Sequence, residues 1–126
     1  MKSQASVEFL IITIGVLFFF TLIFIAIQNN IEDKNKEKEE LVIKSLALSI
    51  QNEVSLARSS SNGYIRNFSI PENINGKEYN LAIINSRIYI NTSNIALSLI
   101  AGDVNGTVKK GENEIRKENE KVYLNK

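Results

Sequence analysis

The stretch QASVEFLIITIGVLFFFTLIFIAI, residues 4–27, decides the fold of this chain. It holds one charged side chain, Glu8, and the rest of it is almost wholly apolar. An α-helix rises about 1.5 Å per residue, so about 20 apolar residues suffice to cross a bilayer core about 30 Å thick. The stretch therefore predicts a membrane-spanning helix with only Met1, Lys2 and Ser3 before it.

Glu8 lies inside the apolar stretch rather than beside it. A carboxylate in such a segment is costly unless it is protonated or finds a partner, so by default the position is a functional one. Among packed copies of the helix, a buried polar partner for Glu8 would favour one axial register over others. Glu8 is therefore a candidate functional residue.

The run KSQASVEFLI, residues 2–11, resembles the processing motif of archaeal type IV pilin-like precursors with class III signal peptides. In that family a prepilin peptidase cuts just before the Gln, and a Glu is the fifth residue of the mature chain. The resemblance implies cleavage between Ser3 and Gln4, with residues 1–3 as the leader. This chain has Ser3 where the family often has Gly, and Phe9 where it often has Tyr.

The resemblance also implies a function, which is that of a structural subunit of a pilus-like surface filament for adhesion and attachment, and not of an enzyme. The precursor is anchored in the membrane with its head outside, and the pilus assembly machinery then builds the mature chain into an extracellular homopolymer. The α-amino group freed on Gln4 pairs with Glu8 of a neighbouring copy, unless Gln4 cyclises. The apolar helices pack to form the filament core, through Phe9, Leu10, Ile11, Leu17, Phe18, Phe20 and Phe24.

Composition narrows the chemistry that the chain can carry. Its 126 residues leave room for one small domain after the apolar stretch. There is no Cys for a disulfide or thiolate site and no His to act as a base or metal ligand. The net charge of +1 is spread over mixed residues, so no nucleic-acid surface is indicated. We predict no catalytic residues, no cofactor and no metal site.

Residues 28–60 continue the helix in two steps. The segment 28–40 is strongly polar and rich in Glu and Lys, which favour a solvated helix. From Leu41 to Arg58 the pattern becomes one-sided, and the cluster Ser59–Gly63 ends it. The predicted apolar stripe is Val42, Leu46, Ile50, Val54 and Ala57, widened by Ile43 and Ala47.

Residues 61–126 change to a period of two, which predicts a β-rich extracellular head. We expect the head to pack on the one-sided part of the helix, which gives an α+β fold with a long N-terminal helix on a small antiparallel sheet. The strands could instead form a small β-sandwich. Turns are expected at Asn75–Gly76, Asn85–Ser86 and residues 103–106. The strands are expected at 64–70, 79–83, 88–90, 95–101, 107–109, 114–116 and 122–124.

Three glycosylation sequons stand in this head, at Asn67, Asn91 and Asn105. None stands before it, which favours an extracellular glycoprotein. Asn105, in an expected turn, is the best placed of the three, and Asn67, within an expected strand, is the worst. The competing interpretation is that all three are ordinary strand and turn residues.

Other interpretations of the chain remain open at this level. A cleaved secretory signal has a shorter apolar core and a small-residue cleavage site, which this run does not match well. A simple signal anchor explains the apolar run but leaves Glu8 unexplained. The alternative function is a membrane-anchored extracellular binding module that does not polymerise. An anchored hydrolase is disfavoured because the head lacks His, Cys and a converging acid pair.

Overall fold

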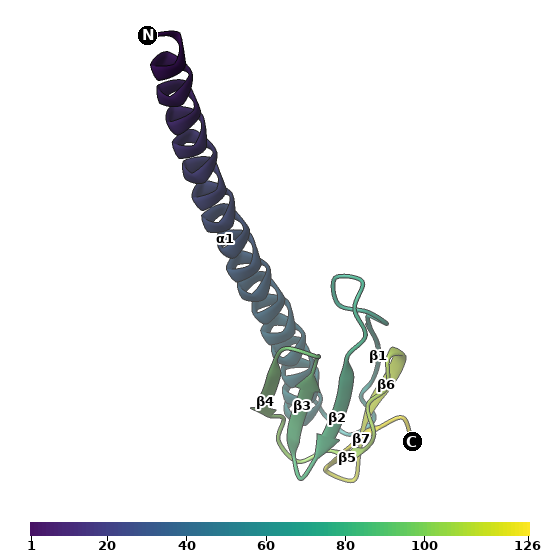
Figure 1. Ribbon diagram of the computed structural model, residues 1–126. Coiled ribbons are helices and arrows are strands. Elements are labelled where there is room, and N and C mark those ends of the chain that lie inside the picture. The colour runs from purple at the N-terminus through teal and green to yellow at the C-terminus, as the bar shows by residue number, and fades with distance from the viewer. The chain divides into compact units, whose positions relative to one another are not determined.

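The computed structural model describes all residues, Met1–Lys126. The chain divides into two compact units, Met1–Glu37 and Lys38–Lys126, called here the N-terminal unit and the head. Helix α1 runs from Lys2 to Ser59 and so contributes to both units (Figure 1). The long helix predicted from the sequence is confirmed, including its end beside the turn-forming cluster.

Seven strands follow α1 and form two sheets in the head (Figure 1). One sheet has the order β1-β6-β7-β5 and the other the order β2-β3-β4. All neighbours are antiparallel except the short β5 and β7, which pair in parallel. The α+β class is confirmed. The strands are β1 Ile65–Ile70, β2 Asn80–Ile84, β3 Arg87–Asn91, β4 Ala96–Ile100, β5 Asn105–Gly106, β6 Gly111–Glu118 and β7 Lys121–Leu124.

Two local predictions in the head are wrong. Residues 107–109 form no strand, and the turn expected at 103–106 instead contains β5, which pairs with Tyr123 and Leu124 of β7. The pairing partner lies far along the chain, so the local alternation of residues gave no sign of it. The expected strand at 114–116 is also longer than predicted, because the polar residues on both sides of it belong to β6.

The core of the head lies between the second part of α1 and the two sheets. The buried helix residues recur every three or four positions, as one face of a helix requires. The stripe is turned slightly from the predicted one, since Val42 and Leu46 are only partly buried. From the sheets and loops come Ile70, Ile74, Tyr79, Ile88, Ile90, Ala101, Val108, Ile115, Val122 and Leu124; from α1 come Ile43, Ala47, Ile50, Val54 and Ala57.

Lys117 of β6 closes the end of α1. Its side chain is buried, and its Nζ donates hydrogen bonds of 2.8 Å to the backbone carbonyls of Arg58 and Ser60. The last carbonyls of a helix have no partner within the helix, and a cation there also opposes the negative end of the helix dipole. Lys117 therefore joins the end of the helix to the sheet.

We predict that Lys117→Met lowers the free energy of unfolding of the full chain by about 1.5–3 kcal/mol, because the substitution removes two charge-assisted bonds inside the protein. Urea unfolding followed by circular dichroism measures the change. Lys121→Met is the matched control, since Lys121 is an exposed lysine of the neighbouring strand. Equal stability of the two variants would contradict this capping role.

The connection between β1 and β2 folds into a small hairpin, residues 71–79, that is tied to the head. A bridge pairs Ile74 with Lys77, and the Tyr79 hydroxyl donates to the carbonyl of Pro71. Tyr79 is only 3% exposed. Burial, and secondarily the nearby Glu72 carboxylate, raise the pKa of the Tyr79 phenol above its ordinary value.

We therefore predict an alkaline loss of stability that depends on Tyr79. Because the folded-state pKa is raised, the stabilisation is complete below the unfolded-state pKa of about 10 and is lost as pH rises through the folded value. Tyr79→Phe keeps the ring but cannot ionise, so its stability should change less over that window. Unfolding curves of both proteins across alkaline pH test this. The same decline in both would refute it.

Candidate functional site

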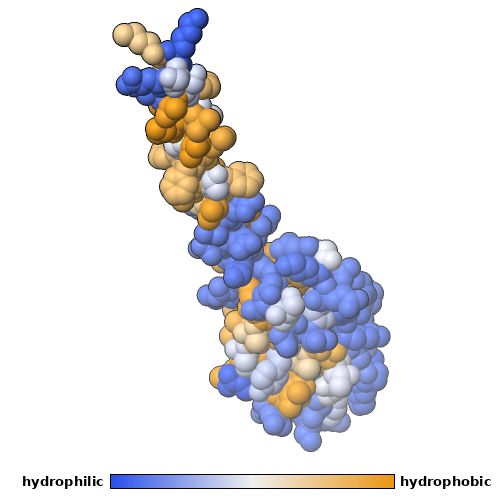
Figure 2. Space-filling view, in the orientation of Figure 1, coloured by the Kyte–Doolittle hydropathy of each residue, from blue (hydrophilic) through white to orange (hydrophobic).

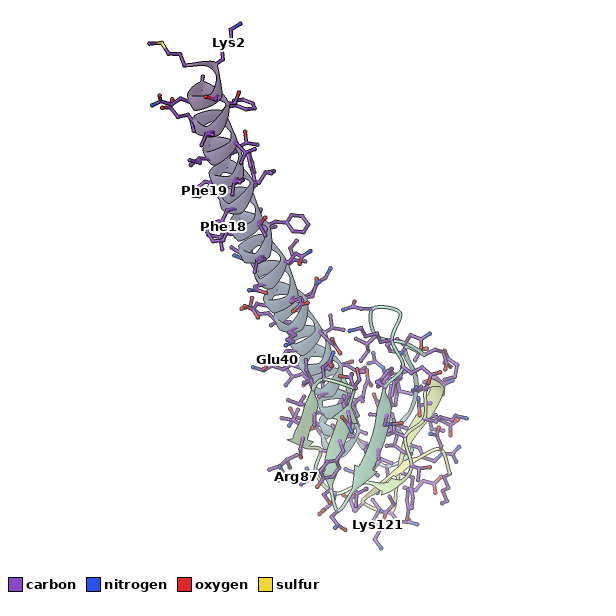
Figure 3. All side chains as sticks on the ribbon, in the orientation of Figure 1. Lys2, Phe18, Phe19, Glu40, Arg87 and Lys121 are labelled. Atoms are coloured by element: carbon purple, nitrogen blue, oxygen red, sulfur yellow. The ribbon has the colours of Figure 1, made fainter.

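The N-terminal unit presents apolar side chains on the face of α1 that Figure 2 shows, and exposed ones occupy consecutive positions such as 9–12 and 16–20 around the helix. No part of the apolar window is buried in the structure. Phe18 and Phe19 project outward from the helix (Figure 3), and they are 65% and 64% exposed. Phe18 is one of the predicted filament-core residues, and the rest of that set is exposed as well, namely Phe9, Leu10, Ile11, Leu17, Phe20 and Phe24.

A helix with this much exposed apolar surface needs an apolar environment around it. Withdrawing apolar surface from water stabilises by about 25 cal/mol per Å², and a helix that is apolar all round is a helix made to be enclosed. By length and composition, α1 contains a segment able to cross a membrane. The unit is therefore compatible with a membrane anchor, and its apolar surface is the first candidate functional surface.

The two threonines of the apolar segment, Thr13 and Thr21, need no outside partner. Thr13 Oγ1 donates to the Phe9 carbonyl at 2.8 Å, and Thr21 Oγ1 donates to the Leu17 carbonyl at 2.9 Å. Both hydrogen bonds are local to the helix, so both side chains can enter an apolar environment without leaving a donor unsatisfied. Neither threonine therefore calls for a polar partner on another molecule.

Glu8 differs from the two threonines. It is exposed, and the ion pairs of the chain all lie in the head. Gln4 lies one helical turn before it, on the same side of α1. Ser3 and Gln4 are exposed at the very start of the helix, where helix ends fray most readily. The structure thus places the predicted processing and assembly residues together at one exposed end.

A second apolar strip on α1 belongs to the head and was missed in the sequence analysis. Leu41 is 63% exposed and Leu48 is 40% exposed, on a face away from the buried stripe. Shallow grooves run along both sides of the ridge that Leu41, Ser45 and Ser49 form. The signal was present, since Leu41 and Leu48 are seven residues apart, but the stronger buried stripe concealed it.

The outer face of the β2-β3-β4 sheet is a third exposed surface. Register places Ile84, Arg87 and Ile100 in one row across it, and Ala82, Tyr89 and Ser98 in the next. Ile84 and Ile100 are 55% and 60% exposed, and Tyr89 is 41% exposed. Arg87, labelled in Figure 3, donates from Nε to Ser98 Oγ at 3.0 Å. This face combines apolar and hydrogen-bonding groups without a carboxylate in either row.

The three sequons differ in how the structure presents them. Asn91 is exposed at the end of β3, and a bend at Ser93 and Asn94 follows. Asn67 is exposed but lies within β1, paired with Glu114. Asn105 Nδ2 lies 3.5 Å from the Val122 carbonyl, to which it donates, and Asn105 lies in β5 rather than in the expected turn. The side-chain amide of Asn91 is therefore less engaged than that of Asn105, the site that the sequence favoured, although the Asn91 backbone pairs with Asn80 and Ala96.

If the folded chain meets a glycosylating enzyme, we predict higher occupancy at Asn91 than at Asn105, because the reacting Nδ2 of Asn91 is free and a bend follows it. Peptide mapping by mass spectrometry of native protein gives both occupancies. Asn91→Gln should remove most of the attached glycan, and Asn105→Gln should change little. Predominant occupancy at Asn105 would show this argument to be wrong.

The head has no group of three or more His, Cys, Asp or Glu residues placed to hold a metal ion. Comparisons of the chain with protein-family models, with curated proteins and with solved structures found no match.

Proposed function

We propose that this chain is a structural subunit of an archaeal type IV pilus-like surface filament that serves adhesion and attachment. The main observation behind this proposal is the exposed apolar segment of α1, residues 4–27, whose one carboxylate, Glu8, has no ion-pair partner and lies one turn after Gln4. The precursor is held in the membrane by this helix with the head outside. A prepilin peptidase cuts before Gln4, and the pilus assembly machinery moves the mature chain into the polymer.

Polymerisation follows from the surface of the helix. In the filament, neighbouring copies enclose one another's apolar side chains, which removes them from water after the chain leaves the lipid. The freed α-amino group of Gln4 neutralises Glu8 of an adjacent copy. Since the two groups are four residues apart, an axial offset of about 6 Å aligns them, and other offsets leave a buried charge unpaired.

The exposed strip on the head supports the same proposal. Small residues let helices approach closely, and Ser45 and Ser49 continue the ridge from Leu41 and line the grooves on either side of it. A neighbouring helix lying along this ridge would cover Leu41 and Leu48. The strip thus extends the assembly surface beyond the N-terminal unit.

The outer face of the β2-β3-β4 sheet is suited to contacts with surface ligands. Its rows offer the Tyr89 ring, the Arg87 guanidinium and the Ser98 hydroxyl beside exposed isoleucines. The same face supports the second candidate, a membrane-anchored binding module that does not polymerise. In that case the chain would keep residues 1–3, and Glu8 would have no partner on another copy.

We predict that Glu8→Ala gives chains that are cut before Gln4 but do not assemble, because the pairing that selects the register is gone. Intact mass and peptide mapping of the membrane and sheared surface fractions, with electron microscopy of the latter, measure cleavage and filaments. Thr13→Val is the matched control on the same helix, since the Thr13 hydroxyl bonds only within α1. It should form filaments as the native chain does.

Two results would overturn the proposal. Native chains that begin at Met1 and stay in the membrane fraction would favour the anchored binding module. Glu8→Ala chains that assemble as well as Thr13→Val chains would remove Glu8 from the assembly mechanism, even with cleavage intact.

A further inference from the structure

The chain contains three Asn-Gly pairs, Asn62–Gly63, Asn75–Gly76 and Asn105–Gly106. In such a pair the glycine nitrogen can attack the asparagine Cγ, since no side chain on glycine hinders the approach. The new N–C bond closes a cyclic imide, the Cγ–Nδ2 bond breaks, and ammonia leaves with the proton of the attacking N–H. Water then opens the imide at either carbonyl, which yields aspartate or isoaspartate.

The structure protects Asn62–Gly63 against this reaction. Asn62 Nδ2 donates to Glu120 Oε1 at 2.9 Å, and Asn62 Oδ1 accepts from the Glu120 backbone N–H at 2.9 Å. The attacking nitrogen is also engaged, because the Gly63 N–H donates to the Lys117 carbonyl at 2.8 Å. Ring closure there requires all three hydrogen bonds to break.

Asn105–Gly106 is held by strand pairing. The Asn105 side chain donates to the Val122 carbonyl, and the two residues face Tyr123 and Leu124 across β5 and β7. The backbones approach so closely that a Cβ at Gly106 would collide with the Leu124 carbonyl. The backbone rotation that closes the ring is therefore blocked unless β5 leaves the sheet.

Asn75–Gly76 is free of all these restraints. It forms the tip of the hairpin between Ile74 and Lys77, with φ values of 51° and 74° that are typical of a type I′ turn. Both residues are exposed, and nothing lies within 4 Å of the Cβ position of Gly76. The hydrogen bonds of the hairpin run between Ile74 and Lys77 and leave the Asn75 side chain and the Gly76 N–H unengaged.

We propose that Asn75 is a spontaneous modification site of the folded protein, converting to aspartate and isoaspartate, and that isoaspartate there releases the hairpin from α1. The proposal does not depend on the filament function. The reaction needs only water and liberates ammonia.

The consequence for the hairpin follows from the contacts of Lys77. Its backbone exchanges two hydrogen bonds with Ile74, of 2.9 and 3.0 Å, and its Nζ lies 3.4 Å from Glu39 Oε2 of α1. Glu39 is 4% exposed, and its Oε1 has no hydrogen-bond partner, so Lys77 is the cation that neutralises it. A buried charge depends strongly on such a partner.

Isoaspartate disturbs this arrangement in two ways. It adds a carbon atom to the backbone of a two-residue turn whose geometry sets the Ile74–Lys77 register. It also adds a carboxylate two residues from Lys77, which competes with Glu39 for the same ammonium group. The Ile74–Lys77 pairing positions both the buried Ile74, which is 2% exposed, and the Lys77 ammonium group beside Glu39. Both contacts would weaken if this pairing were lost.

The test follows deamidation in the full chain in detergent at mildly alkaline pH, by peptide mapping that resolves aspartate from isoaspartate. Asn75 should convert at least about tenfold faster than Asn62 or Asn105, because those two react only through local opening. In the urea-unfolded chain the three sites should convert at similar rates. Equal rates in the folded chain, or an Asn75 that stays unmodified while the unfolded chain reacts, would overturn the proposal.

Hydrogen exchange tests the release of the hairpin. Residues 71–79 should exchange faster in aged native protein than in aged Asn75→Gly protein, whose Gly-Gly turn keeps the hairpin geometry but has no side-chain amide to react. Freshly prepared samples of the two should exchange alike. Isoaspartate accumulation without faster exchange would disprove the link to Glu39 and Lys77.

Discussion

The head depends on one face of α1, the stripe of Ile43, Ala47, Ile50, Val54 and Ala57, which is buried to within 1% of full exclusion from solvent. Two sheets made of short strands have too little apolar surface to form an adequate core alone, because small domains bury a smaller share of their surface. Packing against the stripe gives both sheets a common core. Lys117 then fixes the end of the helix, and the Glu39–Lys77 pair holds the β1–β2 hairpin against the part of α1 where the head begins.

The same helix meets two different environments. Up to Ile27 it is apolar on all sides and leaves these side chains exposed, whereas from Ile43 it buries one face and turns polar groups outward. The polar segment 28–40 separates these two parts of the helix, and nearly all of its side chains are exposed to solvent. The proposed function would use this division, because the apolar part could move from a bilayer into a polymer while the head keeps its own core.

Polar residues of β6 show where local patterns fail. The strand reads GENEIRKE, and residue type assigns its charged and amide residues to solvent, yet Asn113 and Lys117 face inward with Ile115. Asn113 bonds to the backbone of Lys109 and Gly111 and to the side chain of Asn125, and these bonds satisfy its buried amide. The partners of the buried Lys117, Arg58 and Ser60, lie 59 and 57 residues away in the chain, so no local window of sequence predicts its burial.

By itself, the sequence determined the long helix, its apolar and one-sided parts, the position of Glu8 and most of the strands, because each of these rests on periodicity or residue type over a few neighbouring turns. The absence of Cys and His from the sequence also excludes thiol and imidazole side chains from any site of this chain. Tertiary structure alone decided the division into two sheets, the parallel pairing of β5 with β7, the inward role of Lys117 and the different settings of the three sequons. Each of these depends on contacts between residues far apart in the chain, and their free energies arise only once the helix face is covered.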